Sequence, residues 1–178
     1  MKEKTTQLFN RLEEQRKELL AGYESLSPEQ LAFKPEPGAW NHLQVLRHII
    51  TAERQSLAYI QRRISRGSEL TKAGFNSWFR HKILQLALFL PLKFKAPKIA
   101  QVDEEYPDYE SMKAEWDEVR AGYQELINMH DGEALAKTIY RHPRAGLLNM
   151  NQAIEFMETH ISHHIKQIGR IKRHSLFP

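Results

Sequence analysis

The stretch NMNQAIEFMETHISHHIKQIGRIKR, residues 149–173, decides the fold and also carries a cluster of histidines. Its apolar side chains return at three- and four-residue steps, the pattern of a helix buried along one face. At about 100° per residue, His164 and Ile171 fall within about 40° of His160 around the helix axis. The pattern therefore predicts a long helix with His160 and His164 in its apolar arc.

Three further segments share this periodicity and lie at residues 4–25, 42–66 and 106–130. Proline and glycine separate them, because PEPGAW at 35–40 cannot be helical. Asn41 directly after this break is placed to cap the next helix. Four long helices without strands predict an all-α four-helix bundle.

The composition fits one globular domain that covers residues 1–178. Apolar residues make up 41% of the chain and charged residues 27%, which excludes a disordered or collagen-like protein. Cysteine is absent, which excludes disulfides, a cysteine nucleophile and thiolate metal sites. Metal chemistry would therefore have to come mainly from the nine histidines and from carboxylates.

The charge pattern favours an ordinary solvated surface. The formal net charge is +4, but charges of both signs are interspersed along most of the chain, so no nucleic-acid partner is expected. The first fifteen residues, MKEKTTQLFNRLEEQ, lack the apolar run and cleavage site of a secretory signal. We expect a cytoplasmic protein.

A long crossover, residues 68–105, joins the second and third predicted helices. Its centre, WFRHKILQLALFLPLKFK at 78–95, is strongly apolar with basic flanks but too short to span a bilayer, which needs about 20 apolar residues. Either its apolar side chains pack on the bundle or a partner subunit, or residues 76–98 lie on a lipid surface. The packing side chains would be Leu84, Leu86, Phe89 and Leu90. Packing is favoured because bundles with long crossovers are common.

His160 and His164 are four residues apart, so their rings can direct nitrogens to one ion. Alternatively, each ring hydrogen-bonds to a neighbouring side chain or buried water, which is common for an isolated pair. A third ligand would decide between these readings, and His48, at the border of the apolar stripe of helix 42–66, is the best candidate. His163 lies near the polar edge of its helix. The other histidines lie at helix ends, in loops or in the crossover, and no two of them form a pair four residues apart on a helix.

Two stretches resemble the signatures of the DinB-like superfamily, which includes the YfiT-like metal-dependent hydrolases and the DinB_2 type. They are PEPGAWNHLQVLRHIITAERQSL at 35–57 and HPRAGLLNMNQAIEFMETHISHHIKQI at 142–168. The first signature, Pro-x-x-Gly-x-Trp before a helix with a histidine in its second turn, is matched by Pro35, Gly38, Trp40 and His48. The second, a His-Pro and Gly loop before His-x-x-His-His-x-x-Gln-Ile, is matched by His142, Pro143, Gly146, His160, His163, His164, Gln167 and Ile168.

The resemblance implies a bundle of up-down-down-up topology with a divalent metal ion, usually zinc or nickel, held by His48, His160 and His164. It also implies a homodimer. Three imidazoles leave an open position for water or a substrate thiol, as in catalytic rather than structural sites. We therefore expect a metal-dependent hydrolase or a thiol S-transferase of the bacillithiol or glutathione type, acting on a small molecule.

No catalytic base is identified from the sequence. Glu53 lies about 140° around its helix from His48 and is not expected to be a ligand. Gln55, Gln167 and His163 are candidates to orient a ligand or the substrate. A non-catalytic metal- or ligand-binding bundle is the alternative.

Overall fold

The computed structural model describes residues 1–66, 70–89 and 106–178, without the side chain of Phe89. Within these ranges four long helices form the bundle: α1 (Lys2–Glu24), α3 (His42–Ile64), α5 (Tyr109–Met129) and α7 (Met150–Lys172). The shorter elements are α2 (Pro28–Ala32), α4 (Phe75–Phe89), α6 (Gly132–Ala136), β1 (Tyr140–His142) and β2 (Gly146–Leu148). The predicted four-helix bundle is confirmed, and the predicted bounds of its helices agree to within three residues.

The two helices that carry the candidate ligands begin at the same kind of cap. Asn41 accepts a hydrogen bond from the backbone N–H of Gln44, whose side chain bonds back to the Asn41 backbone. Asn149 and Gln152 form the same box at the start of α7. Each box satisfies two backbone donors that a helix start leaves open, so it fixes where the helix begins. The predicted cap at Asn41 is confirmed.

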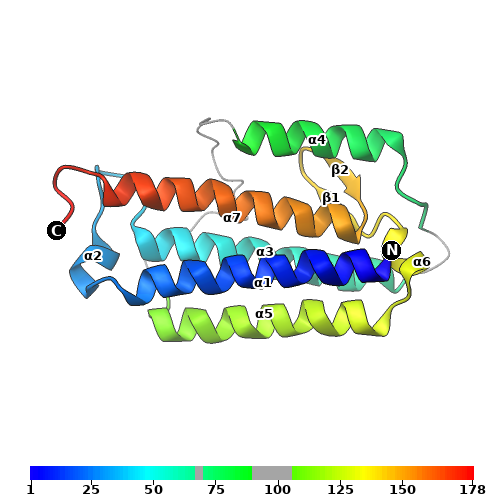
Figure 1. Cartoon of the computed structure of the whole chain (residues 1–178), viewed down its shortest axis with the longest axis horizontal. Coiled ribbons are helices and arrows are strands. Elements are labelled where there is room, and N and C mark those ends of the chain that lie inside the picture. The colour runs from blue at the N-terminus through cyan, green and yellow to red at the C-terminus, as the bar shows by residue number, and fades with distance from the viewer. Residues whose placement is uncertain (67–69, 90–105) are drawn as a thin grey trace.

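In the bundle, α1 and α3 each pack on both α5 and α7. Helices α3 and α5 run in one direction and α1 and α7 in the other (Figure 1). The core between them is aromatic and aliphatic, with Trp116, Tyr23, Tyr123, Leu46, Ile49 and Ile127 among its fully buried side chains. Burial of these stripes, rather than local helix propensity, supplies most of the stability of such an arrangement.

The crossover contains a helix, α4, that packs along α7 at the outside of the bundle (Figure 1). Leu84 is buried, as the packing interpretation expects, and Leu88 is buried with it. Leu86 is 61% exposed, so of the two expected places for it, the bundle or a partner subunit, the bundle is wrong. The reason is helical geometry, because residues two apart point to different sides of a helix. The side chains of Phe89 and Leu90 lie outside the described residues.

The expectation that the chain has no strands is also wrong. Strands β1 and β2 form an antiparallel hairpin between α6 and α7, with Tyr140 opposite Leu148 and His142 opposite Gly146. Gly146 has a φ of +76°, which side chains rarely adopt, so glycine suits the end of this tight turn. The Nδ1 of His142 accepts hydrogen bonds from the backbone N–H groups of Arg144 and Ala145. Three-residue strands are too short for alternation to reveal them in the sequence.

None of the helices in the described ranges has the length and apolar character needed to cross a membrane.

Candidate metal centre

Helices α3 and α7 bring three histidines together. The Nε2 of His160 lies 3.2 Å from the Nε2 of His48 and 3.1 Å from the Nε2 of His164. The three candidate ligand nitrogens all lie within 4.8 Å of one another. Within the described ranges no other set of His, Asp or Glu side chains converges in this way. The structure thus brings together the three histidines that the resemblance singled out.

The spacing of these nitrogens suits a small divalent cation. Nitrogens about 2.0–2.1 Å from a tetrahedral zinc ion are separated from one another by about 3.3–3.4 Å. The two shortest separations in the cluster, 3.1 and 3.2 Å, are close to this value. Three neutral nitrogen donors suit zinc or nickel better than magnesium or calcium, which prefer oxygen. The residues present therefore fit a three-histidine metal site.

Burial keeps the rings of His160 and His164 in the neutral form that binds metals. His48 is 5% exposed and His164 6% exposed, while His160 is only partly buried, so the cluster is not sealed from solvent. Burial lowers the pKa of His164 to about 3, and the neighbouring His48 lowers it further. Burial, then the charges that His164 and His48 would carry, hold the pKa of His160 well below its usual value. Near neutral pH both rings have a free lone pair.

Gln167 lies against one of the three rings. Its Oε1 is 2.9 Å from the Nδ1 of His164, three residues earlier on α7. Because an amide oxygen only accepts, His164 donates from Nδ1, and its Nε2 lone pair faces the cluster. This is the arrangement in which an outer residue fixes the tautomer and orientation of a metal ligand.

The other two candidates for orienting residues lie differently. The Nδ1 of His163 is 3.1 Å from the backbone carbonyl oxygen of Leu88, so this ring donates to the end of α4. Gln55 lies on α3, seven residues beyond His48, and is partly buried.

The sequence signatures acquire a physical role around the cluster. Trp40 packs its ring 5.0 Å from the ring of His48, centroid to centroid. The φ of +78° at Gly38 allows the turn that brings Trp40 there. On the other side, His142 of the hairpin contacts Phe156 at 4.4 Å, and Phe156 stacks on His160 at 5.5 Å. Aromatic side chains thus flank the rings of His48 and His160.

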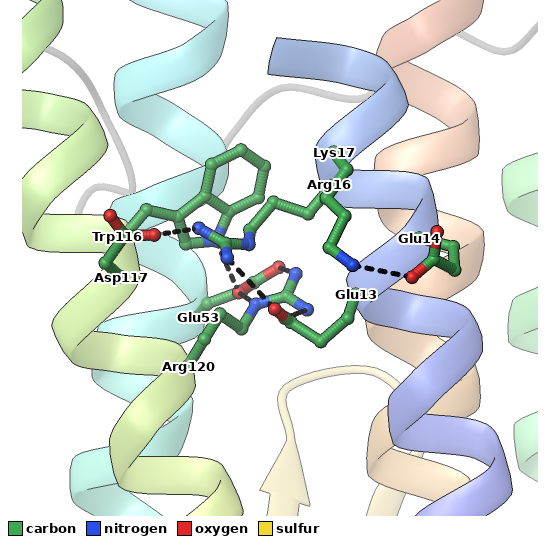
Figure 2. A network of polar contacts seen from close by, with 8 residues as sticks. All are labelled: Glu13, Glu14, Arg16, Lys17, Glu53, Trp116, Asp117 and Arg120. Carbon is green, nitrogen blue, oxygen red and sulfur yellow. Dashed lines mark hydrogen bonds and ion pairs between the residues drawn. The ribbon is translucent and has the colours of Figure 1, made fainter. Parts of the chain in front are cut away.

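Glu53 points away from the histidines, as expected, and belongs to a second buried polar cluster (Figure 2). Both of its carboxylate oxygens accept 2.8 Å hydrogen bonds from the guanidinium of Arg120. Trp116 donates its indole N–H to the same carboxylate, and Glu13 of α1 accepts from Arg120. We call Glu13, Glu53, Trp116 and Arg120 the ion-pair cluster. Sequence analysis missed it, although Arg120 follows Trp116 by four residues on the same apolar face.

His81 of α4 is a further buried histidine that sequence analysis left without a role. Its ring is fully buried, and its Nε2 lies 2.9 Å from Oε2 of Glu155 on α7. The hydrogen bond from His81 is the main cause that lowers the pKa of Glu155. This contact joins α4 to α7 about one and a half turns before His160. In the sequence its only sign is a single histidine between Arg80 and Lys82 in the apolar crossover.

Comparison with known proteins places this architecture among solved bundles. "TT2238, a four-helix bundle protein" is 21% identical, with a TM-score of 0.59 over 93% of this chain and 98% of that one. YfiT from Bacillus subtilis, described as a probable metal-dependent hydrolase with an unusual four-helix bundle topology, is 18% identical, with a TM-score of 0.64. That match covers 97% of this chain and 88% of YfiT. At these identities the two structures show the shared fold. No curated protein matches the sequence significantly.

The sequence itself carries the stronger relationship. The profile of the DinB superfamily matches residues 11–168, a range that includes all three clustered histidines and both signatures. The resemblance noted in the sequence is thereby confirmed, and this chain belongs to the DinB superfamily.

Proposed function

We propose that the protein is a metal-dependent enzyme that holds one divalent cation, zinc or nickel, through His48, His160 and His164. The observation that carries this proposal is the convergence of three imidazole nitrogens from α3 and α7. Two findings support the proposal: the chain belongs to the DinB superfamily, and its fold is similar to that of YfiT, which is described as a probable metal-dependent hydrolase. Three protein ligands are typical of catalytic sites, whereas structural sites use four.

The chain's own residues would position this ion and keep it reactive. A divalent cation in such a site lowers the pKa of a bound water or thiol and so supplies a nucleophile near neutral pH. All three ligands are neutral, so none of them cancels the charge of the ion. Gln167 holds His164 in the ligating tautomer, and Trp40 and Phe156 restrict the rings of His48 and His160.

Two reactions fit this site. The first is hydrolysis of a small molecule, which the description of YfiT favours. The second is transfer of a low-molecular-weight thiol, such as bacillithiol or glutathione, to an electrophilic substrate. Because the chain has no cysteine, the thiol of such a reaction has to be a substrate. We also propose a cytoplasmic location, where such thiols are abundant, and a homodimeric state.

Metal content is the first test. The purified full-length protein, stripped with chelator and reloaded, should hold about one equivalent of zinc or nickel by elemental analysis. His160→Ala should lose it, while His130→Ala, which alters a histidine at the end of α5, should retain it. Wild-type protein that stays metal-free after reloading would exclude the proposal.

Activity is the second test. The metal-loaded protein is assayed with a panel of ester and amide substrates, and separately for thiol consumption with an electrophile such as a chloronitrobenzene. Turnover that His160→Ala abolishes in one panel assigns the reaction class. Stoichiometric metal with no turnover in either panel would instead support a non-catalytic metal-binding bundle.

A further inference from the structure

Helix α4 is apolar on two opposite sides. One side, with His81, Leu84 and Leu88, is buried against the bundle. The other side is exposed to a degree unusual for such side chains: Phe75 is 77%, Phe79 51% and Ile83 52% exposed. Trp78 and Leu86 are also exposed, at 49% and 61%. We call Phe75, Trp78, Phe79, Ile83 and Leu86 the outer face of α4.

An outer face of this kind needs a cover. A helix with large apolar side chains on two opposite sides normally buries both sides, in a protein core, at an interface or in lipid. Three of its five side chains are aromatic, and large exposed aromatic patches mark sites of protein or membrane interaction. Figure 1 shows α4 at the edge of the molecule, with α7 on one side of it and no other labelled helix on the opposite side. The face is therefore placed to meet another surface.

The charge around this face selects the kind of surface. The described residues 70–89 contain three cations, Lys72, Arg80 and Lys82, and no Asp or Glu. This part of the surface is therefore basic. Arg80 and Lys82 are exposed on α4 itself. An anionic surface would complement this charge.

The neighbouring hairpin extends the same character. Ser77 of α4 donates a hydrogen bond to the backbone carbonyl of Leu147 on β2, which joins the two elements. Leu147 is 38% exposed, and its cross-strand partner Arg141 is exposed as well. An apolar and a basic side chain thus continue the surface beside α4.

A second copy of the chain fits the outer face of α4 less well than an anionic bilayer does. Two-fold packing of the outer face on itself would bring Arg80 and Lys82 of the two copies together, and α4 has no acidic residue to separate them. Like charges opposed in an interface are costly. An anionic bilayer meets both the apolar and the basic requirement, because aromatic side chains settle at the headgroup level while cations bind anionic lipids.

We propose that the outer face of α4 docks on an anionic phospholipid surface, with the aromatic side chains inserted at the headgroup level and Arg80 and Lys82 bound to lipid phosphates. The helix lies in the plane of the surface, since it is too short to cross a bilayer. The outer face of α4 contains none of the three histidines, so the proposal stands independently of the proposed enzyme activity.

The test is co-sedimentation of the full-length protein with vesicles of phosphatidylcholine containing 30% phosphatidylglycerol, at low salt. We expect binding that weakens with added salt and is much lower on pure phosphatidylcholine. Arg80→Gln with Lys82→Gln should weaken binding about 25-fold, from about fivefold per cation near an anionic surface. Phe79→Ser with Ile83→Ser should abolish measurable binding.

Matched controls separate docking from misfolding. Met129→Ser alters a side chain that is 72% exposed on α5 and should leave binding unchanged. Both α4 variants change only exposed side chains, so their helix content and unfolding midpoint should match the wild type. Trp78 offers a direct probe, because its emission should shift to the blue on vesicle binding and Trp78→Phe should remove that shift.

Three results would overturn the proposal. The first is no binding of the wild type to the anionic vesicles. The second is equal binding by the Phe79→Ser, Ile83→Ser variant. The third is a dimer in light scattering that this variant converts to a monomer, because the outer face would then be covered by a second copy.

Discussion

Helix α3 takes part in two buried polar clusters, one made of three histidines and the other of paired opposite charges. His48 contributes to the three histidines shared with α7, and Glu53, five residues later, contributes to the ion-pair cluster shared with α1 and α5. Five residues turn the helix by about 140°, so the two side chains leave it on different sides. The same helix thus supports two clusters with different chemistry.

The ion-pair cluster is complete within the chain. Figure 2 shows Glu53 and Arg120 in contact, with Trp116 and Glu13 close by, and all four are joined by hydrogen bonds of 2.8 Å. Arg120 also lies over the Trp116 ring at 5.3 Å. Arg120 pairs with Glu53, and Glu13 also pairs with Arg16 at 3.0 Å, so each of these charges has an opposite partner, as the burial of ionised groups requires.

The histidine cluster is built differently. Its nitrogens face one another, and the Nε2 of His164 is an acceptor because its Nδ1 proton goes to Gln167. No described carboxylate joins the three rings. The comparison teaches that a buried cluster whose opposite charges are paired is structural, whereas one whose imidazole nitrogens converge on a common point is suited to a cation from outside.

The largest expected effect comes from breaking the structural cluster. Arg120→Ala would leave the Glu53 carboxylate buried without its cation and should lower the free energy of unfolding by about 3–5 kcal/mol. Chemical denaturation of the metal-free protein measures it. Lys17→Ala, which removes the exposed Lys17–Glu14 pair of Figure 2, is the control and should cost less than about 1 kcal/mol. Equal losses in both variants would contradict the comparison.

Metal should stabilise only through the histidine cluster. At a free zinc concentration about 100 times the dissociation constant, the unfolding free energy should rise by about 2.7 kcal/mol. His160→Ala should abolish this rise, whereas Lys17→Ala should keep it. Denaturation with and without zinc measures both. A rise that survives in His160→Ala would show that the ion binds elsewhere.

Acid should weaken the histidine side of the molecule. Burial, then the charge of Arg144, lowers the pKa of His142 to about 4, so the unfolded chain takes up this proton first as the pH falls. Stability from the neutral ring is present above about pH 6.5 and is lost as the pH falls towards 4, by about 2 kcal/mol after allowance for the ring's partial exposure. Denaturation at successive pH values measures the slope.

His142→Asn is the matched variant for this pH effect. An asparagine oxygen can accept from backbone N–H groups two and three residues ahead but does not titrate. The part of the slope that belongs to His142 should therefore disappear while stability at pH 7 is largely kept. An unchanged slope would mean that His142 does not contribute to it.

The smallest effect tests the residue that orients a ligand. Gln167→Leu keeps the size of the side chain but removes the acceptor for the Nδ1 proton of His164. Metal affinity should fall at least tenfold, about 1.4 kcal/mol, by competition titration with a chelator. Gln167→Glu restores an acceptor and should recover the affinity. Unchanged metal affinity in the leucine variant would show that Gln167 does not orient His164 for metal binding.

Much of the fold could be predicted from the sequence because amphipathic periodicity and caps are local signals. The bounds of α7 and the cap at Asn41 follow from such signals. The hairpin at 140–148 was not predicted, because its strands are only three residues long and form by pairing with each other. The exposure of Leu86 could not be predicted, because the packing of α4 on α7 decides which side of α4 is buried.

The candidate site divides in the same way. The pair His160 and His164 is visible within one helix, whereas His48 stands 112 residues before His160, and spacing on one helix says nothing about a ligand on another. The role of Arg120 could not be predicted in this way, because its two carboxylate partners, Glu13 and Glu53, come from α1 and α3.

The sequence by itself determined the four amphipathic helices and the two histidines on one helical face, because each depends on residues within a few turns of one another. Its composition alone also excluded cysteine ligands. Only the tertiary structure decided which rings converge, which charges pair and which side of α4 remains exposed. These depend on how helices distant in sequence pack, since burial and hydrogen-bond partners are properties of neighbours in space.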